Sequence, residues 1–353
     1  MSSSSLPKEH KVWLLKTRPS DSSTPNEFEL ITRPTPTIDD LQKGQVLIKN
    51  TSFGNDPAQR VWMDGSIDPR RLYVPPILKG QPVRASAMGT VVLSKSDVWK
   101  EGDKVYSEGD WAEYSVVQDS GPLTGKEIHI KGQSEYITNS ILGLTGQTAW
   151  VGVFKEMELK PEHVLVVSGA AGAVGSTVIQ IAKKVIGVKT IIGIAGGKEK
   201  CDWVKSIGAD DCVDYKDSEY PEHLKTLLPD YADRFFDNVG GEILDTMLTL
   251  VKRHGHVTVC GAISGYNGEG LTLKHWGEII YNRITIKGML ILDHASALDQ
   301  AVSDLTRWVS DGTISNTESE TVVEGKFEDI PKIYNRLFSG QNKGKLITKL
   351  IDV

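Results

Sequence analysis

The sequence predicts a two-domain α/β protein, with a doubly wound parallel sheet and a second, mostly antiparallel β domain. Between residues 136 and 316, short apolar runs alternate with stretches of helical period, which is typical of a parallel sheet. From residue 1 to about 135, short strand-like runs alternate with turns rich in proline and glycine. After residue 317 the strand pattern returns, so we expect residues 1–135 and 317–353 to form one discontinuous domain around 136–316.

Length and composition exclude several classes of protein. The chain has 353 residues, enough for two substantial cores, with 39% hydrophobic and 24% charged residues, as in soluble globular proteins. A net charge of −6 argues against binding to nucleic acid or to an anionic membrane. We find no apolar segment of signal-peptide length and no run near the roughly 18 residues of a membrane span. Three cysteines are too few for a disulfide framework, so we expect a cytoplasmic protein.

A glycine-rich turn in the second domain predicts dinucleotide binding. Val164–Ser168 has the length of a buried strand, and Gly169, Gly172 and Gly175 follow at three-residue spacing. Apolar residues then recur at helical period up to residue 185, and a second strand is expected at Thr190–Ala195. Glycine lets the backbone approach a pyrophosphate closely, and the unpaired N–H groups at the helix start hold the anion. Turns and helix–strand packing also use glycine, but the strand–helix–strand context favours the nucleotide.

The end of the second strand indicates which dinucleotide binds. An NAD site usually carries an acidic residue there, whereas this chain has Gly196 and Gly197 followed by Lys198, Glu199 and Lys200. The lysines can meet a 2′-phosphate, and Glu199 between them is expected to face solvent. The sequence therefore favours NADP over NAD, although a solvated helix N-terminus would give the same pattern.

The remaining strands of the second domain are expected at 211–215, 234–239, 256–263 and 284–292, and its helices at 199–207, 222–228, 243–252, 274–282 and 297–309. Ligands of such sheets bind at the carboxyl ends of the strands. In the first domain we expect strands at 11–16, 45–50 and 89–94. The tail should add a strand after residue 320, a short helix near 329–338 and a final strand at Lys345–Leu350.

Several motifs together resemble one protein family. GTVVLSKSDVWKEGDKV (89–105) and GDWAEYSVV (109–117) resemble the GroES-like domain of medium-chain dehydrogenases/reductases. SGAAGAVGS (168–176), FFDNVGGE (235–242), CGAISGYN (260–267) and GQNKGKLITK (340–349) resemble the zinc-independent, NADP-dependent alkenal/one oxidoreductases, which include prostaglandin reductases and plant double-bond reductases. This resemblance implies a Rossmann domain for NADPH and a GroES-like domain.

The resemblance also implies that no metal is bound. Zinc enzymes of the wider superfamily carry a cysteine near residue 55 and Gly-His-Glu near residue 80, where this chain has Asn55-Asp56 and Gly80-Gln81-Pro82. The four-cysteine lobe of those enzymes is missing too. His254, His256 and Cys260 have no further ligand around them, so we expect no metal there either.

The family positions that match this chain imply a set of cofactor-binding residues. They comprise Pro57, Ala170, Ala171, Gly172, Ala173, Val174, Gly175, Gly196, Lys200, Tyr215, Asn238, Cys260, Gly261, Ala262, Ile263, Ser264, Tyr266, Met289, Leu290, Ile291 and Asn342. Lys200 would contact the 2′-phosphate, Met289 to Ile291 would border the nicotinamide, and Asn342 would close over the phosphates. Cys260 is equally well explained as a small buried hydrophobe.

The implied reaction is hydride transfer from NADPH to the β-carbon of an enal or enone. Negative charge then develops on the carbonyl oxygen, and an enzyme without metal needs a hydrogen-bond donor there. Tyr266 is our candidate catalytic residue, because a phenol stays protonated at neutral pH. Water could supply the final proton instead. Reduction of ketones or quinones on the same fold stays open, as does a non-catalytic NADPH-binding protein.

Two expectations concern substrate and assembly. Relatives often have Asp-Pro-Tyr or Asp-Pro-Thr where this chain has Asp56-Pro57-Ala58, so one aromatic wall is missing. Apolar candidates for the substrate site, each equally explained as core, are Trp62, Met63, Tyr73 and Trp276. The apolar strand at 284–292 lies last in the sheet, and an exposed edge of this kind predicts a homodimer.

Overall fold

The computed structural model describes residues 6–19, 24–268 and 272–352. The chain forms two compact units. The first comprises Met1–His129, Thr321–Gln341 and Leu346–Val353, and the second comprises Ile130–Glu320 and Asn342–Lys345. Each unit is considered by itself.

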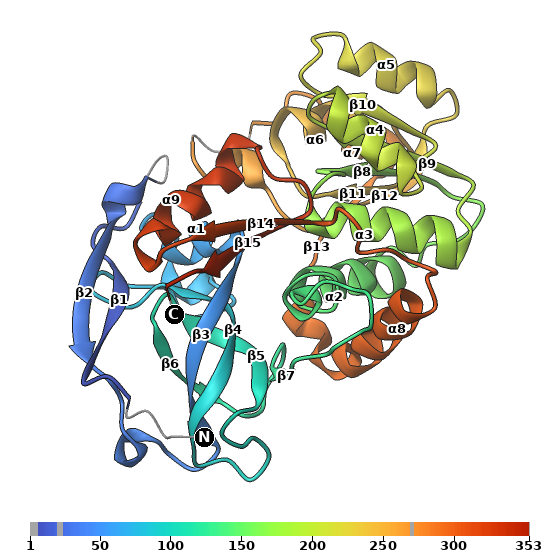
Figure 1. Cartoon of the computed structure of the whole chain (residues 1–353). Helices are drawn as coiled ribbons and strands as arrows, with labels where there is room; N and C mark the ends of the chain where they lie inside the picture. Colours follow the sequence, from blue (N-terminus) through green and yellow to red (C-terminus); the bar gives the residue numbers. More distant parts are fainter. Residues whose placement is uncertain (1–5, 20–23, 269–271, 353) are drawn as a thin grey trace. The chain divides into compact units, whose positions relative to one another are not determined.

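The first unit is built on antiparallel strands. Its main sheet has the order β14-β15-β3-β4-β5-β7, with β6 paired to β3, and β1 and β2 form a separate pair. The bounds are β1 Glu9–Leu15, β2 Phe28–Pro34, β3 Gln45–Asn55, β4 Arg84–Ser94, β5 Lys104–Asp110, β6 Tyr114–Gln118, β7 Gly125–Lys126, β14 Glu320–Gly325 and β15 Lys345–Leu350, with helices α1 Ala58–Met63 and α9 Ile330–Tyr334. Because β15 pairs antiparallel with β3, the C-terminal strand is part of the main sheet of this unit (Figure 1).

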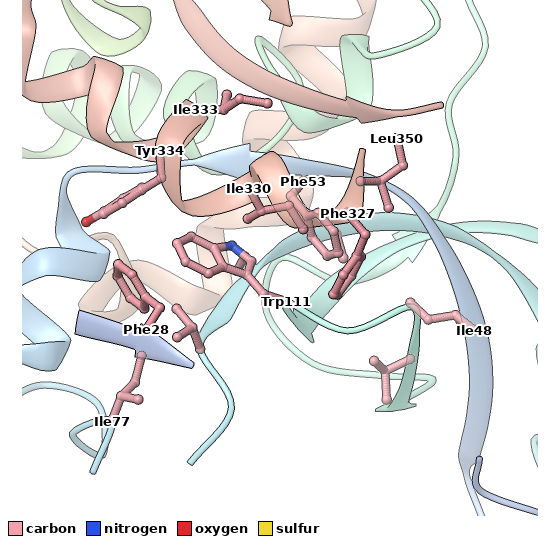
Figure 2. Packing of buried hydrophobic residues seen from close by; sticks show 14 of the residues in the cluster. Phe28, Ile48, Phe53, Ile77, Trp111, Phe327, Ile330, Ile333, Tyr334 and Leu350 are labelled. Atoms are coloured by element: carbon pink, nitrogen blue, oxygen red, sulfur yellow. The ribbon is translucent and has the colours of Figure 1, made fainter. Parts of the chain in front are cut away.

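An aromatic cluster forms the core of the first unit. Trp111 is fully buried, and its ring centroid lies 5.2 Å from that of Phe28 and 5.3 Å from that of Tyr334 on α9. Figure 2 shows Phe53 and Phe327 around the same tryptophan. The returning tail therefore contributes part of this core as well as a strand.

The second unit contains the predicted parallel sheet. Within the described residues the sheet has six strands in the order β10-β9-β8-β11-β12-β13, and every printed pairing between them is parallel. The bounds are β8 Val164–Ser168, β9 Thr190–Ala195, β10 Asp211–Asp214, β11 Ala232–Asp237, β12 Val251–Val259 and β13 Thr285–Gly288. The two strands that frame the glycine-rich turn, β8 and β9, have the predicted bounds, and the fold class is confirmed.

Helices cover the sheet of the second unit. They are α2 Leu144–Val151, α3 Ala173–Ile181, α4 Lys198–Ser206, α5 Tyr220–Leu227, α6 Gly241–Leu248, α7 Gly277–Asn282 and α8 Leu298–Ser310. Apolar side chains of α5 and α6 pack on residues of β8, β9, β10 and β11. Helices α3 and α8 both pack on α2 (Figure 1). Both α2 and α3 continue into a π-helical turn, Gly152–Glu156 and Ala182–Ile186 respectively.

Two predicted elements of this sheet are wrong in their bounds. The fifth strand begins at Val251, so the helix expected at 243–252 ends at Leu248. The sixth strand ends at Gly288, and the apolar residues beyond it enter a 3-10 segment, Ile291–Ala297. Ile291 is buried there, and a short apolar run does not distinguish a strand from a buried helical turn.

Candidate functional site at the carboxyl edge of the parallel sheet

The glycine-rich turn joins β8 to α3 and leaves little room for side chains. Gly169 has a φ of +57°, a left-handed conformation that favours glycine. A Cβ on Gly175 would lie 2.5 Å from the carbonyl oxygen of Gly169. The N-cap of α3 is Gly172, which has no side chain to cap the helix. The first turn of α3 therefore presents N–H groups and the positive end of the helix dipole to an anion.

The tail segment 342–345 lies against this turn within the same unit. The amide of Gly344 donates to the carbonyl oxygen of Ala171 at 2.9 Å, and Gly344 forms a β-bridge with Gly172. The Nδ2 of Asn342 donates to the carbonyl oxygen of Gly344 at 3.1 Å. The structure thus brings Asn342, distant in sequence, to the predicted phosphate turn.

At the end of β9, the predicted residues Gly196 and Tyr215 are in contact. A Cβ on Gly196 would lie 2.9 Å from ring atoms of Tyr215, so the tyrosine ring covers this glycine. Lys200 lies half-buried in the first turn of α4, and Glu199 beside it is exposed. Burial, and then the nearby cation of Lys216, lowers the pKa of Lys200.

The ends of β8 and β11 are joined by a buried carboxylate that the sequence analysis did not single out. Asp237 is fully buried and accepts hydrogen bonds from the Ser168 hydroxyl at 2.6 Å and from two backbone amides, Val239 at 3.0 Å and Gly240 at 3.1 Å. Burial raises the pKa of Asp237 in spite of these bonds. Its neighbour Asn238, a predicted site residue, donates through Nδ2 to the carbonyl oxygen of Ser168 at 2.7 Å.

The loop after β12 contains the predicted catalytic tyrosine. The amide of Cys260 donates to the Asp237 carbonyl oxygen at 2.8 Å, which ties the loop to β11. The loop continues through a 3-10 turn, Ile263–Gly265, and the amide of Ala262 donates to the hydroxyl oxygen of Tyr266 at 3.1 Å. A Cβ on Gly261 would lie 3.4 Å from that same oxygen. The Tyr266 hydroxyl is therefore held by its own loop.

Cys260 is a neutral thiol at this edge. Burial, and then the charge of Asp237, raises its pKa to about 12. A thiol of this kind is a poor nucleophile, which agrees with a packing role.

The predicted nicotinamide-bordering residues follow β13. The Met289 amide donates to the Val259 carbonyl oxygen at 3.0 Å, so pairing extends one residue past the strand. Leu290 is half-buried and Ile291 is buried. The buried carboxylate of Glu156 contacts residues on both sides of this segment, Lys287 at 2.7 Å and His294 at 2.6 Å.

Pro57 belongs to the first unit, as the N-cap of α1. Three of the apolar candidates for the substrate site, Trp62, Met63 and Tyr73, lie in this unit. Met63 is a fully buried core residue, and the Nε1 of Trp62 donates to the hydroxyl of Tyr73 at 2.9 Å. Trp276, in the second unit, is 59% exposed.

In the described part of the chain, no group of three or more His, Cys, Asp or Glu side chains is arranged to hold a metal ion. No helix of the described residues is both long and apolar enough to cross a membrane.

Comparison with known proteins identifies the family. A family model described as zinc-binding dehydrogenase matches residues 173–309, and one described as N-terminal domain of oxidoreductase matches residues 11–124. The chain is 34% identical to a putative NADP-dependent oxidoreductase, YfmJ, of Bacillus subtilis, over 96% of this chain and 97% of that protein. It is 33% identical to prostaglandin reductase 1 of Oryctolagus cuniculus, over 95% and 92% of the two chains.

A solved structure agrees with this assignment. CurA of Vibrio vulnificus, crystallised in complex with NADPH, is 27% identical and superposes with a TM-score of 0.85 over 97% of this chain and all of that one. The chain thus belongs to the NADP-dependent reductases of the medium-chain dehydrogenase/reductase superfamily, the family that contains prostaglandin reductase 1.

Proposed function

We propose that this protein uses NADPH to reduce the C=C bond of α,β-unsaturated aldehydes and ketones, and that it does so without zinc. The family of the chain supports the reaction class. The observation that carries the proposal is the loop after β12, which holds the Tyr266 hydroxyl at the same sheet edge as the glycine-rich turn.

The residues at the sheet edge fit the cofactor. A Cβ on Gly175 would clash with the backbone of the turn, and a Cβ on Gly196 would clash with the Tyr215 ring. Both positions therefore require glycine. The backbone of residues 170–175 would hold the pyrophosphate, and Gly196, Lys200 and Tyr215 would hold the adenosine ribose with its 2′-phosphate. Asn238, the loop from Cys260 to Tyr266 and Met289 to Ile291 would line the nicotinamide half, and Asn342 would lie over the phosphates.

When bound, NADPH supplies the hydride that goes to the β-carbon of the substrate. The chain must stabilise the negative charge that develops on the carbonyl oxygen, and Tyr266 supplies an O–H donor for it. The amide of Ala262 donates to the Tyr266 oxygen, which polarises the phenol and strengthens its O–H as a donor. Tyr266 or water then delivers the proton to the α-carbon.

The test is NADPH oxidation with a medium-chain 2-alkenal, an aryl enone, a simple ketone and a quinone, with products identified by mass and NMR. We expect saturation of the alkenal and enone, unaffected by a metal chelator. Tyr266→Phe should lower kcat about 100-fold, as for loss of one oxyanion donor. The matched control is Tyr231→Phe, a 50% exposed tyrosine in the same unit, which should leave kcat unchanged.

Other outcomes separate the alternatives. Alcohol from the ketone with the alkenes untouched would establish carbonyl reduction instead. Turnover of the quinone alone would make the protein a quinone reductase. Tight NADPH binding with no turnover of any substrate would leave a non-catalytic binding protein.

We also propose that the protein is a cytoplasmic homodimer. Strand β13 is the last strand of its sheet and all of its residues are exposed. Nearby on α7, Ile280 and Tyr281 are 65% and 67% exposed. An exposed edge strand beside exposed apolar side chains is typical of a subunit interface. A monomeric mass by light scattering at micromolar concentration would contradict the dimer, and cell fractionation tests the compartment.

A further inference from the structure

Two backbone segments of the second unit are fastened together beside α4. These are residues 195–197, after β9, and residues 214–216, after β10. The amide of Tyr215 donates to the Ala195 carbonyl oxygen at 3.0 Å. The carboxylate of Asp214 accepts hydrogen bonds from the amide of Gly197 at 2.8 Å and from the amide of Lys216 at 3.0 Å. One carboxylate therefore fixes both segments.

The lysines around these segments differ in their partners. Lys198 forms an ion pair with Asp202 one turn further along α4, so its charge is already matched. Lys216 is exposed and, among the described residues, has no carboxylate within ion-pairing distance. Burial lowers the pKa of Lys200 most, the cation of Lys216 lowers it further, and the carboxylate of Glu199 acts in the opposite direction.

The cations of Lys200 and Lys216 repel each other. A dianionic phosphate would remove the repulsion and favour the charged form of Lys200. The fastened segments also carry Gly196 and Tyr215, which the fit to the cofactor assigns to the adenosine ribose. The pair of lysines thus lies where the 2′-phosphate of NADPH would be recognised.

We propose that Lys216 is a second binding residue for the 2′-phosphate of NADPH, and that Asp214 is the positioning residue that holds the Lys216 segment beside Lys200. This inference rests on the proposed use of NADPH. Selection of NADPH over NADH would then depend on Lys216, after β10, as well as on Lys200 at the start of α4.

The test uses two ligands that differ only in the 2′-phosphate, 2′,5′-ADP and 5′-AMP, titrated into the full chain by calorimetry. Lys216→Ala should weaken 2′,5′-ADP binding about tenfold, as for loss of one charge-assisted hydrogen bond, and leave 5′-AMP binding unchanged. Lys216→Arg should retain most of the affinity. The KM for NADPH should rise in Lys216→Ala while the KM for NADH does not.

Two further lysine variants sharpen the test. Lys225→Ala removes an equally exposed lysine of α5, paired with Glu222, and should change neither ligand's affinity. Lys198→Ala should cost less 2′,5′-ADP affinity than Lys216→Ala, because Lys198 is already paired with Asp202. A larger loss in Lys198→Ala would overturn the assignment.

Asp214→Ala tests the positioning role. It should reduce the ratio of the 2′,5′-ADP affinity to the 5′-AMP affinity, and the ratio should then be insensitive to adding Lys216→Ala. Equal weakening of both ligands would show that Asp214 is merely structural and would overturn its role.

Two results distinguish an error in the proposed use of NADPH from an error in the role of Lys216. If the unmodified protein binds 2′,5′-ADP no more tightly than 5′-AMP, the proposed use of NADPH is wrong. If it prefers 2′,5′-ADP and Lys216→Ala keeps that preference, only the role of Lys216 is wrong.

Discussion

The cores of the two units of this chain differ in their aromatic content. The first unit is centred on an aromatic cluster around Trp111, closed by α9 from the tail. The second unit buries mainly aliphatic residues of β8 and β9, such as Val166, Ile192 and Ile194, between layers of helices. Strands β8 and β9 are buried through most of their length, and each is followed directly by a glycine.

One buried charged group in each unit shows a second difference. In the first unit, the buried guanidinium of Arg60 is paired with Asp64 at 2.9 Å within one helix. In the second unit, the buried carboxylate of Asp237 joins the ends of different strands. Because Asp237 links two strand ends, it fixes the loops that follow them. These loops would hold a ligand.

The largest expected effect is on the aromatic core. Trp111→Ala should lower the free energy of unfolding by about 4 kcal/mol, because it removes a large, fully buried ring and leaves a cavity. Urea unfolding followed by circular dichroism measures the change. Val98→Ala, at a 60% exposed position of the same unit, should change it by less than about 0.5 kcal/mol. A loss below about 1 kcal/mol for Trp111→Ala would show that the cluster is not the core.

The next effect concerns the carboxylate of the second unit. Asp237→Ala leaves the Ser168 hydroxyl and the amides of Val239 and Gly240 without their acceptor, and should cost about 3 kcal/mol. Asp237→Asn keeps one acceptor oxygen and should cost less. Because burial raises the pKa of Asp237, the protein should gain stability relative to Asp237→Asn as the pH falls toward about 4. Thermal unfolding across that range tests both expectations, and a difference that does not depend on pH would contradict the second.

A smaller loss is expected in the glycine-rich turn. Gly175→Ala places a Cβ 2.5 Å from the Gly169 carbonyl oxygen and 3.0 Å from the Ala170 Cα, and backbone atoms cannot easily move away. We expect a loss of about 2 kcal/mol, together with weaker binding of NADPH. Gly125→Ala is the control, since its Cβ would meet no atom within 4 Å. Unchanged NADPH affinity in Gly175→Ala would argue against phosphate binding at this turn.

The smallest effect is a pH dependence at Glu156. Burial acts to raise the pKa of Glu156, but hydrogen bonds from Lys287 and His294 outweigh it, and the pKa is lowered. The carboxylate therefore stabilises the fold above its unfolded pKa of about 4.3, and this stability is lost as the pH falls through the lowered value. Glu156→Gln should cost about 1 kcal/mol at pH 7 and less at acid pH.

The measurement is thermal unfolding of Glu156→Gln and of a control at both pH values. Glu222→Gln removes an exposed carboxylate of α5 that pairs with Lys225, and should have little effect at either pH. If the cost of Glu156→Gln were the same at both pH values, the ion pair would not be its source.

The fold of the second unit could be predicted from local pattern because its strands are short, apolar and separated by helices of clear period. The bounds of β8 and β9 agree with the prediction. The prediction is wrong where an apolar run changes its backbone conformation, at Ile291, because hydrophobicity reports burial and not the type of element.

The candidate site could be predicted only in part. Glycines and a tyrosine in a recognisable spacing identify the positions of Gly175, Gly196 and Tyr266 along the chain. Nothing in the local sequence distinguishes Asp237, Asp214 or Lys216 from other charged residues after a strand. Their roles depend on which strand ends become neighbours.

The sequence by itself determined the order of strands and helices, the glycine turn between β8 and β9 and the family of the protein, because each depends on residues close together in the chain. Only the tertiary structure decided which side chains meet. It placed Gly344 against Ala171, it joined the amides of Gly197 and Lys216 through Asp214, and it buried Asp237 between two strand ends. These contacts arise from parallel pairing and from the returning tail, which join segments that no local pattern connects.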